Sequence, residues 1–300
     1  MGDLGAGSGA GAGSIAMLPP WICLDDALKG WIAEDIGRGD VTTQGLLAGS
    51  VRMGRAYWVA KMDGVVAGLP VMERLFYLLD SEVEVTLNRC DGEYCQAGTA
   101  IAEIQGSLAS LLMGERVALN LVMRLSGIAT VTRQYVDLLA DLSVSLVDTR
   151  KTTPGLRVFE KYASRVGGAV NHRMGLDDAV MLKDNHLAVM ESVEAAVSQV
   201  RSNIPYPLSI EVEAETIEQM EAAILAGADI VMLDNMPPSE MREAVRIARN
   251  NVRSVTLEAS GNITLETVRA VAETGVDYIS TSATVTRSPW MDISMKFEVG

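Results

Sequence analysis

A basic segment lies within a strongly acidic chain. Residues 149–183 contain seven Lys and Arg and three acidic residues, a net charge of +4, whereas the 300-residue chain has 25 basic and 39 acidic residues and a net charge of −14. Arg150, Lys151 and Lys183 come within a few residues of the ends of short apolar runs that are typical of β-strands. Converging cations bind phosphate, diphosphate or dicarboxylate groups through charge-assisted hydrogen bonds, so the segment predicts an anion-binding site. The other basic residues fit the solvated face of a helix: Arg157, Lys161 and Arg165.

Two carboxylates follow neighbouring strand-like runs. Glu213 comes directly after residues 208–212 and Asp234 directly after residues 230–233, so both would face the same cavity. Such groups can bind ribose hydroxyls, hold Mg²⁺ through water or stabilise a cationic centre. They can also neutralise the cations in salt bridges, so the carboxylates by themselves do not identify a reaction.

Further polar candidates lie in loops. Ser260, Gly261 and Asn262 follow a strand-like run and open a helical pattern, where free N–H groups suit a phosphate. His172 lies in a Gly- and Arg-containing loop (GGAVNHRMG) without apolar periodicity, which favours a site residue, and His186 is less favoured. No Ser-His-Asp or Cys-His arrangement and no pair of His at metal-ligand spacing stands out, so neither covalent catalysis nor tight transition-metal binding is indicated.

The elements that would position these groups begin after residue 143. Six short apolar runs alternate with amphipathic helical patterns: residues 144–147, 179–182, 208–212, 230–233, 255–257 and 278–279. This alternation is typical of a parallel sheet. With no strand left over to protect an edge, six units favour closure into a barrel, in which functional groups lie at the carboxyl ends of the strands.

The first half of the chain has a different pattern. Residues 51–106 contain short β-like runs around one helical stretch, which indicates a mixed α+β region. Residues 108–140 fit one long helix or two abutting helices that meet near Gly127. Arg116, Asn120 and Arg124 are spaced at i, i+4 and i+8 and share one helix face. That face is either a solvated polar stripe or a surface for an anion or a partner.

Composition excludes several classes of protein. Hydrophobic residues make up 48% of the chain and charged residues 21%, which is typical of a globular protein with a large core. No apolar run approaches the length of a membrane helix, and the negative charge makes nucleic acid or an anionic membrane an unexpected partner. Three cysteines fit free thiols in the cytoplasm. Residues 1–17 are rich in Gly and Ala without a basic start, which predicts a flexible tail rather than a signal peptide.

Several long motifs resemble one enzyme family, quinolinate phosphoribosyltransferase. The segments that carry the resemblance are EDIGRGDVTT (34–43), ERVALNLVMRLSGIAT (115–130), DTRKTTPGLR (148–157), EKYASRVGGAVNHRMGL (160–176), MLKDNH (181–186), IEVEAET (210–216), ADIVMLDNM (228–236) and LEASGNI (257–263). The resemblance extends from about residue 20 to the end of the chain. It implies an α/β protein with an N-terminal α+β sandwich domain and an open parallel α/β barrel.

The resemblance also implies the domain limits and the assembly. The sandwich domain would comprise residues 18–125 together with residues 287–300, and the barrel residues 126–286. The family forms homodimers, or multiples of dimers, in which each active site is completed by the partner subunit.

The reaction implied by the resemblance joins quinolinate to phosphoribosyl diphosphate in NAD synthesis. It is a pentosyl transfer that yields nicotinate mononucleotide, CO₂ and diphosphate. Mg²⁺ would arrive with phosphoribosyl diphosphate, near Glu213 and Asp234. No organic cofactor is expected, because the ribosylated ring nitrogen is itself cationic and stabilises the carbanion that decarboxylation leaves.

The resemblance assigns roles to residues of this sequence. Lys151, Glu213 and Asp234 would be catalytic, with the two carboxylates facing the ribose. The anion-binding wall would comprise Thr149, Arg150, Lys151, His172, Arg173 and Lys183. The phosphate would be held by Ser260, Gly261, Asn262, Thr281, Ser282 and Ala283. Arg116 would reach into the partner's site and bind a quinolinate carboxylate. The chain departs from the family pattern at Ser282, where Gly is usual, and at Thr286, where His is usual.

Two other readings stay open at the level of sequence. A barrel aldolase would use Lys183 or Lys151 as a Schiff base, which requires a desolvated lysine. A relative with the same fold could take another pyridine or pyrimidine acid, or bind an anion without turnover.

Overall fold

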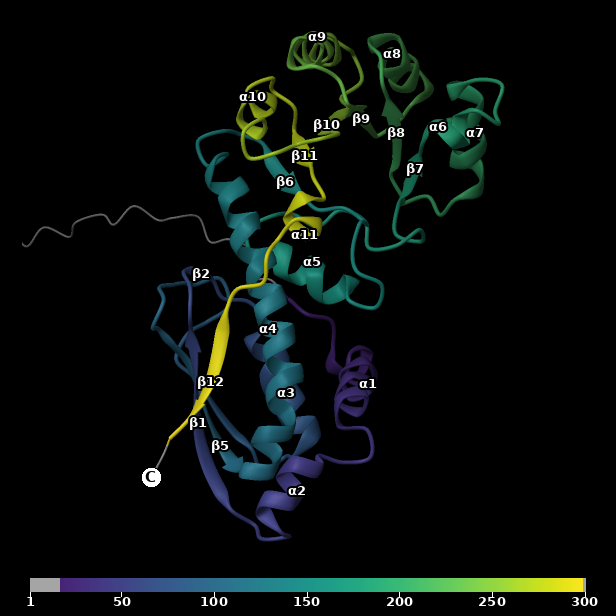
Figure 1. The fold of residues 1–300 in the computed structure, drawn as a ribbon. Coiled ribbons are helices and arrows are strands. Elements are labelled where there is room, and N and C mark those ends of the chain that lie inside the picture. Colours follow the sequence, from purple (N-terminus) through teal and green to yellow (C-terminus); the bar gives the residue numbers. More distant parts are fainter. Residues whose placement is uncertain (1–16, 299–300) are drawn as a thin grey trace, which may run out of the picture.

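The computed structural model describes residues 17–298, so the expected tail lies outside the described residues apart from Met17. Figure 1 shows a sheet with covering helices in one half and a ring of strands and helices in the other, joined by the long helix α4 (Leu108–Asp137). None of the described helices is both long and apolar enough to span a bilayer. All three cysteines are free thiols.

The first sheet is antiparallel and has the order β12-β1-β5-β3. Its strands are β1 (Met53–Ala60), β3 (Glu84–Leu87), β5 (Ala100–Ser107) and β12 (Ile293–Phe297). Trp58 of β1 lies opposite Met295 of β12, so the end of the chain returns to the first domain. A short second pair joins β2 (Gly64–Val65) to β4 (Tyr94–Cys95).

Helices cover one face of this sheet, which explains the alternation along β1. Ala56, Trp58 and Ala60 are fully buried, whereas the residues between them are partly exposed. Helices α3 (Leu69–Leu79) and α4 pack together, and α1 (Asp25–Ile36) packs on both. The remaining N-terminal helices are η1 (Trp21–Cys23) and α2 (Val41–Leu47).

Helix α4 runs unbroken through Gly127, so the single-helix alternative is confirmed. At 1.5 Å per residue its 30 residues span about 45 Å. A Cβ atom on Gly127 would lie 1.9 Å from the carbonyl oxygen of Pro289. The glycine therefore lets the chain that leaves the barrel cross directly against α4.

The second half contains six parallel strands in the order β6-β11-β10-β9-β8-β7. These strands are β6 (Ser145–Val147), β7 (Val180–Leu182), β8 (Ile210–Ala214), β9 (Ile230–Asp234), β10 (Thr256–Ser260) and β11 (Tyr278–Ser280). Within the described residues β6 and β7 do not pair with each other. The expected closure is therefore wrong, and the barrel is open, as the resemblance implied.

Helices surround the open barrel on its outer side (Figure 1). They are α5 (Arg157–Val166), α6 (Asp184–Leu187), α7 (Val193–Asn203), α8 (Ile217–Ala226), α9 (Pro238–Arg249), α10 (Val268–Ala272) and α11 (Ala283–Thr286). Helix α5 packs against α4, at the junction of the two halves. In β8, Ile210, Val212 and Ala214 are buried in the apolar core, and the alternate residues Glu211 and Glu213 face the opposite way.

Candidate active site

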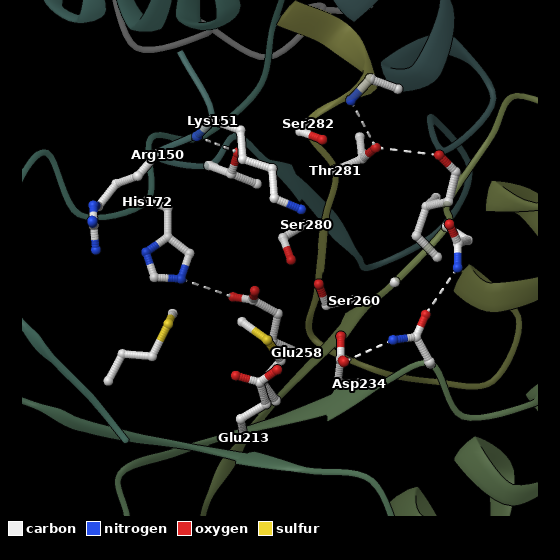
Figure 2. A pocket seen from close by; sticks show the side chains of 18 of the residues that line it. Arg150, Lys151, His172, Glu213, Asp234, Glu258, Ser260, Ser280, Thr281 and Ser282 are labelled. Atoms are coloured by element: carbon white, nitrogen blue, oxygen red, sulfur yellow. Dashed lines mark hydrogen bonds and ion pairs between the residues drawn. The ribbon is translucent and has the colours of Figure 1, made fainter. Parts of the chain in front are cut away.

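A cavity of about 630 Å³ opens at the carboxyl ends of the barrel strands. The structure brings together every expected site residue except Arg116 along its wall. These residues are Thr149, Arg150, Lys151, His172, Arg173, Lys183, Glu213, Asp234, Ser260, Gly261, Asn262, Thr281, Ser282 and Ala283. Figure 2 shows the basic residues Arg150 and Lys151 on one side of the cavity and Glu213 and Asp234 on the opposite side.

The basic side chains of the cavity include close neighbours of like charge. Burial, and then the positive charge of Arg150, lower the pKa of Arg173. Arg173 is anchored by a hydrogen bond from Nη1 to the carbonyl oxygen of Ala179 at 2.8 Å. Lys183 Nζ donates to Glu213 Oε2 at 3.0 Å, so one cation is paired across the cavity. Repelling cations in a partly buried wall favour an anionic ligand.

A buried ion pair supports the two loops that carry the cations. Asp148, at the end of β6, pairs with Lys161 of α5, and both side chains are 1% exposed. The same carboxylate accepts the side-chain N–H of Asn171 at 2.6 Å and the main-chain N–H of His172 at 2.9 Å. The expected solvated position of Lys161 is therefore wrong, because α5 is enclosed between the two halves of the molecule.

A second buried carboxylate links the domains. Glu160 is fully buried and accepts hydrogen bonds from Arg124 Nη2 at 2.8 Å and from the main-chain N–H of Thr153 at 2.8 Å. Arg124 also donates to the carbonyl oxygen of Val285 and to Ser288 Oγ, each at 2.9 Å. The face of α4 that carries Arg124 thus turns into the protein at this point, contrary to the expected surface stripe.

Arg116 lies outside the cavity of its own chain. It is exposed on the first half of α4, which runs beside the N-terminal sheet in Figure 1. Asn120, one turn further along, is half-buried. Of the three residues predicted to share one face, Arg116 is the one that the structure leaves exposed.

His172 forms a cluster with two glutamates at the base of the cavity. Its Nε2 lies 3.2 Å from Glu211 Oε2 and 3.5 Å from Glu258 Oε2. Burial lowers the pKa of His172, but the Glu211 and Glu258 carboxylates raise it, and the net shift is upward. Burial and the Glu211 charge raise the pKa of Glu258 to about 7.

Sequence reasoning did not include these two glutamates among the site residues. The sequence did contain a signal for them, because Glu211 and Glu258 are acidic residues that alternate with apolar residues in the strands IEVEA and TLEAS. Seven other cavity residues had no role assigned from the sequence: Met181, Met232, Asn235, Ile263, Ser280, Thr286 and Arg287.

The loop after β10 is shaped by close backbone packing. Gly261 has φ of +99°, and a Cβ atom there would lie 2.2 Å from Asn235 Oδ1. Asn262 Nδ2 donates to the same oxygen at 3.1 Å. The expectation that residues 260–262 open a helix is wrong, because α10 begins only at Val268.

The two departures from the family pattern lie one helical turn apart. Thr286 Oγ1 donates to the carbonyl oxygen of Ser282 at 3.0 Å within the short helix α11. Thr281 Oγ1 accepts the main-chain N–H of Ala283 at 3.1 Å and donates to Ile263 O at 3.2 Å. The loop from Thr281 to Ala283 is therefore fixed to the segment that follows β10.

Two family models match consecutive parts of the chain. Residues 40–126 match the N-terminal domain of quinolinate phosphoribosyl transferase, and residues 128–296 match its C-terminal domain.

Curated relatives match over most of their length. A probable nicotinate-nucleotide pyrophosphorylase [carboxylating] of Synechocystis is 56% identical over 93% of this chain and 94% of the relative. A protein of the same name from Bacillus subtilis is 46% identical over 91% of this chain and 92% of the relative.

Solved structures show the same architecture. NadC from Streptococcus pyogenes has a TM-score of 0.88 with 41% identity, over 93% of this chain and 97% of that one. The nicotinate-nucleotide pyrophosphorylase from Francisella tularensis has a TM-score of 0.87 with 35% identity, over 93% of this chain and 98% of that one. Since both halves of the chain match in sequence and the fold agrees across them, this protein belongs to the quinolinate phosphoribosyltransferase family.

Proposed function

We propose that this chain transfers the phosphoribosyl group of phosphoribosyl diphosphate to quinolinate, with release of diphosphate and CO₂. The product is nicotinate mononucleotide, a precursor of NAD. The observation that carries the proposal is the division of one cavity into a cationic side, with Arg150 and Lys151, and an acidic side, with Glu213 and Asp234. Arg173 also lines the cavity and lies close enough to Arg150 to feel its charge. The cationic side matches the anionic acceptor, quinolinate, and the acidic side matches C1 of the ribose, which becomes positive during the transfer.

The cationic side binds the carboxylates of quinolinate. Arg150 and Arg173 are partly buried, so each contributes a charge that bulk water screens only partly. Guanidinium groups hold carboxylates with paired hydrogen bonds, which orients the ring as well as binding it. Lys151 follows Arg150 and is the more exposed of the two.

The acidic side acts on the ribose. Positive charge develops at C1 of the ribose as diphosphate leaves, and Glu213 and Asp234 stabilise it by electrostatics. Their oxygens are also the hard ligands that Mg²⁺ prefers, so these two residues suit an ion that enters with the diphosphate. When bound, Mg²⁺ would neutralise part of the negative charge on the departing diphosphate.

Decarboxylation requires no organic cofactor in this proposal. Once the ring nitrogen bears the ribose, it is cationic and stabilises the electron pair that stays on C2 when the C2–carboxylate bond breaks. The chain holds the second carboxylate of quinolinate in place during this step. The loops around Gly261 and Ser282 would bind the 5-phosphate through main-chain N–H groups.

A second copy of the chain completes the site in this proposal. Arg116 is exposed and lies outside its own cavity. Exposed apolar side chains occur nearby on α2, which packs on α4, and at the start of β1: Leu46 is 74% exposed and Met53 69% exposed. Such side chains indicate an interface, and an isologous dimer would bring each Arg116 to the partner's cavity. We expect this dimer to work in the cytoplasm, where the three thiols stay reduced.

The structure disfavours the aldolase alternative. A Schiff-base lysine must be desolvated, but Lys151 is exposed and Lys183 is 44% exposed and paired with Glu213. The buried lysine of this region, Lys161, is paired with Asp148 and does not line the cavity.

Release of CO₂ tests the proposal. Quinolinate labelled at the 2-carboxylate should release labelled CO₂ only when phosphoribosyl diphosphate and Mg²⁺ are both present. Other pyridine and pyrimidine carboxylic acids serve as competing substrates in the same assay. If one of these acids is turned over in preference to quinolinate, the protein uses a different acceptor. If none is turned over, the protein binds an anion without catalysis.

A further inference from the structure

Two buried carboxylates lie close to each other at the base of the cavity. Glu211 of β8 and Glu258 of β10 are 2% and 4% exposed. One oxygen of each faces His172 Nε2, and the three ligand atoms lie within 4.8 Å of one another. Two ionised carboxylates at this separation repel strongly in a buried place, so one of them is held as the neutral acid.

His172 does not neutralise the pair in this conformation. Its Nδ1 accepts the main-chain N–H of Arg173 at 2.7 Å, so the proton of the ring lies on Nε2. The negative charges of the two carboxylates favour a second proton on the ring. That proton would lie on Nδ1, where it would point at the Arg173 N–H and break the hydrogen bond between them. The same tautomer excludes His172 as a metal ligand, because the proton occupies the lone pair that a metal would need.

Glu258 is the member of the pair that carries the proton. It lines the cavity, and Figure 2 shows it between His172 and the acidic residues Glu213 and Asp234. Its pKa is raised to about 7 by burial and by Glu211, although His172, Ser280 and Lys183 act in the opposite direction. A carboxylic acid with a pKa near 7 is a far stronger acid than an ordinary lysine ammonium.

The proposed reaction needs such an acid. When the C2–carboxylate bond breaks, its electron pair stays on C2 and a new C–H bond must form there. An acid whose pKa lies near the working pH transfers its proton most effectively.

We propose that Glu258 is the general acid that protonates C2 of the pyridine ring, an assignment that rests on the proposed function. The C2–carboxylate bond breaks, CO₂ leaves, and the electron pair on C2 takes the carboxyl proton of Glu258. Glu258 becomes a carboxylate, and solvent restores its proton after the product leaves. His172 keeps its tautomer throughout.

Glu258→Gln tests this role. Gln has the size, neutrality and hydrogen-bonding capacity of a protonated Glu, but it has no proton to transfer. We expect the rate of CO₂ release to fall about 100-fold or more, as for loss of a general acid, while the quinolinate Kd from calorimetry is unchanged. The matched control is Glu221→Gln on the exposed side of α8, which should keep full activity. Loss of quinolinate binding in Glu258→Gln would contradict an acid role, because the hydrogen bonds are preserved.

The isotope content of the product decides between donors. The wild type and Glu258→Gln are each assayed in a mixture of H₂O and D₂O. The hydrogen-to-deuterium ratio at C2 of nicotinate mononucleotide is then measured by mass spectrometry. If the product of Glu258→Gln has a different hydrogen-to-deuterium ratio from the wild-type product, the assignment is supported. If the two ratios are equal, another group is the donor and the assignment is overturned, however slow the variant is. If the wild-type protein releases no CO₂ from quinolinate, the proposed function fails and the assignment fails with it. If the wild type turns over and the ratio is unchanged, only the assignment fails.

Discussion

The guanidinium of Arg124 and the carboxylate of Glu160 form an ion pair of 2.8 Å at the junction between α4 and α5. Glu160 is fully buried, and Arg124 is 15% exposed. Glu160 also holds the main chain at Thr153, three residues from Arg150 and two from Lys151. One pair of side chains therefore fixes the position of the cationic loop relative to the N-terminal domain.

Glu160→Gln should destabilise the protein and loosen this loop. Removal of one charge leaves the other buried and unpaired, which costs about 3 kcal/mol for a pair of this kind. Unfolding in urea measures the loss, and KM for quinolinate should rise because Arg150 and Lys151 lose their support. Glu221→Gln is the surface control. A loss of less than about 1 kcal/mol, the value for an exposed pair, would show that solvent screens the interaction.

Gly127→Ala should destabilise the protein at the crossing between the barrel exit and α4. The added Cβ would lie 1.9 Å from Pro289 O, and a main-chain atom cannot move aside as a side chain does. We expect a loss of about 3 kcal/mol, the upper part of the range for overpacking.

Gly30→Ala in α1 is the matched control for this substitution, because no atom of residues 17–298 lies within 4 Å of its Cβ position. It should stabilise α1 by up to about 1 kcal/mol through helix propensity. Equal stability of the two variants in thermal unfolding would contradict the close approach at Gly127.

The positions of the cavity residues were predictable because parallel strands end at one edge. Arg150, Lys183, Glu213 and Asp234 each follow an apolar run, and this local pattern alone places them together. The open edge between β6 and β7 was not predictable in this way, because strand order depends on contacts between distant segments.

Buried charges were the main failure of prediction from the sequence. Lys161 lies on a helix with charged residues along its length, a pattern that is normally a solvated face. Its burial depends on Asp148, which is 13 residues away and comes close only when α5 packs beside β6. Glu211 and Glu258 were given no role for a related reason, since their shared environment is created by strands β8 and β10 with β9 between them.

Nicotinate should be a poor substrate compared with quinolinate. It lacks the 2-carboxylate, so one of the partly buried cations, Arg150 or Arg173, loses its partner. An unpaired buried charge costs a few kcal/mol, which corresponds to about 100-fold or more in kcat/KM. Diphosphate release is the suitable assay, because nicotinate has no carboxylate to lose at C2. Comparable kcat/KM for the two acids would mean that the cationic side does not recognise both carboxylates of quinolinate.

The shared site can be tested by mixing two inactive variants. Arg116→Ala should remove quinolinate binding and leave the fold intact, since Arg116 is exposed outside its own cavity. Lys151→Ala should inactivate the cavity of its own chain. If Arg116 serves the partner, a mixed dimer has one site with both lesions and one with neither. Half of randomly paired dimers are mixed, so activity should recover to roughly a quarter of wild type.

The control for this mixture is Lys151→Ala with Asp234→Ala, because both residues line the same cavity of one chain and every site then carries a lesion. This mixture should stay inactive, which excludes recovery through simple stabilisation of dimers. Subunit exchange is verified by mass spectrometry of differently tagged chains. If exchange occurs and the Arg116→Ala mixture stays inactive, Arg116 serves its own subunit or no site, and the two-fold arrangement proposed for the active sites is wrong.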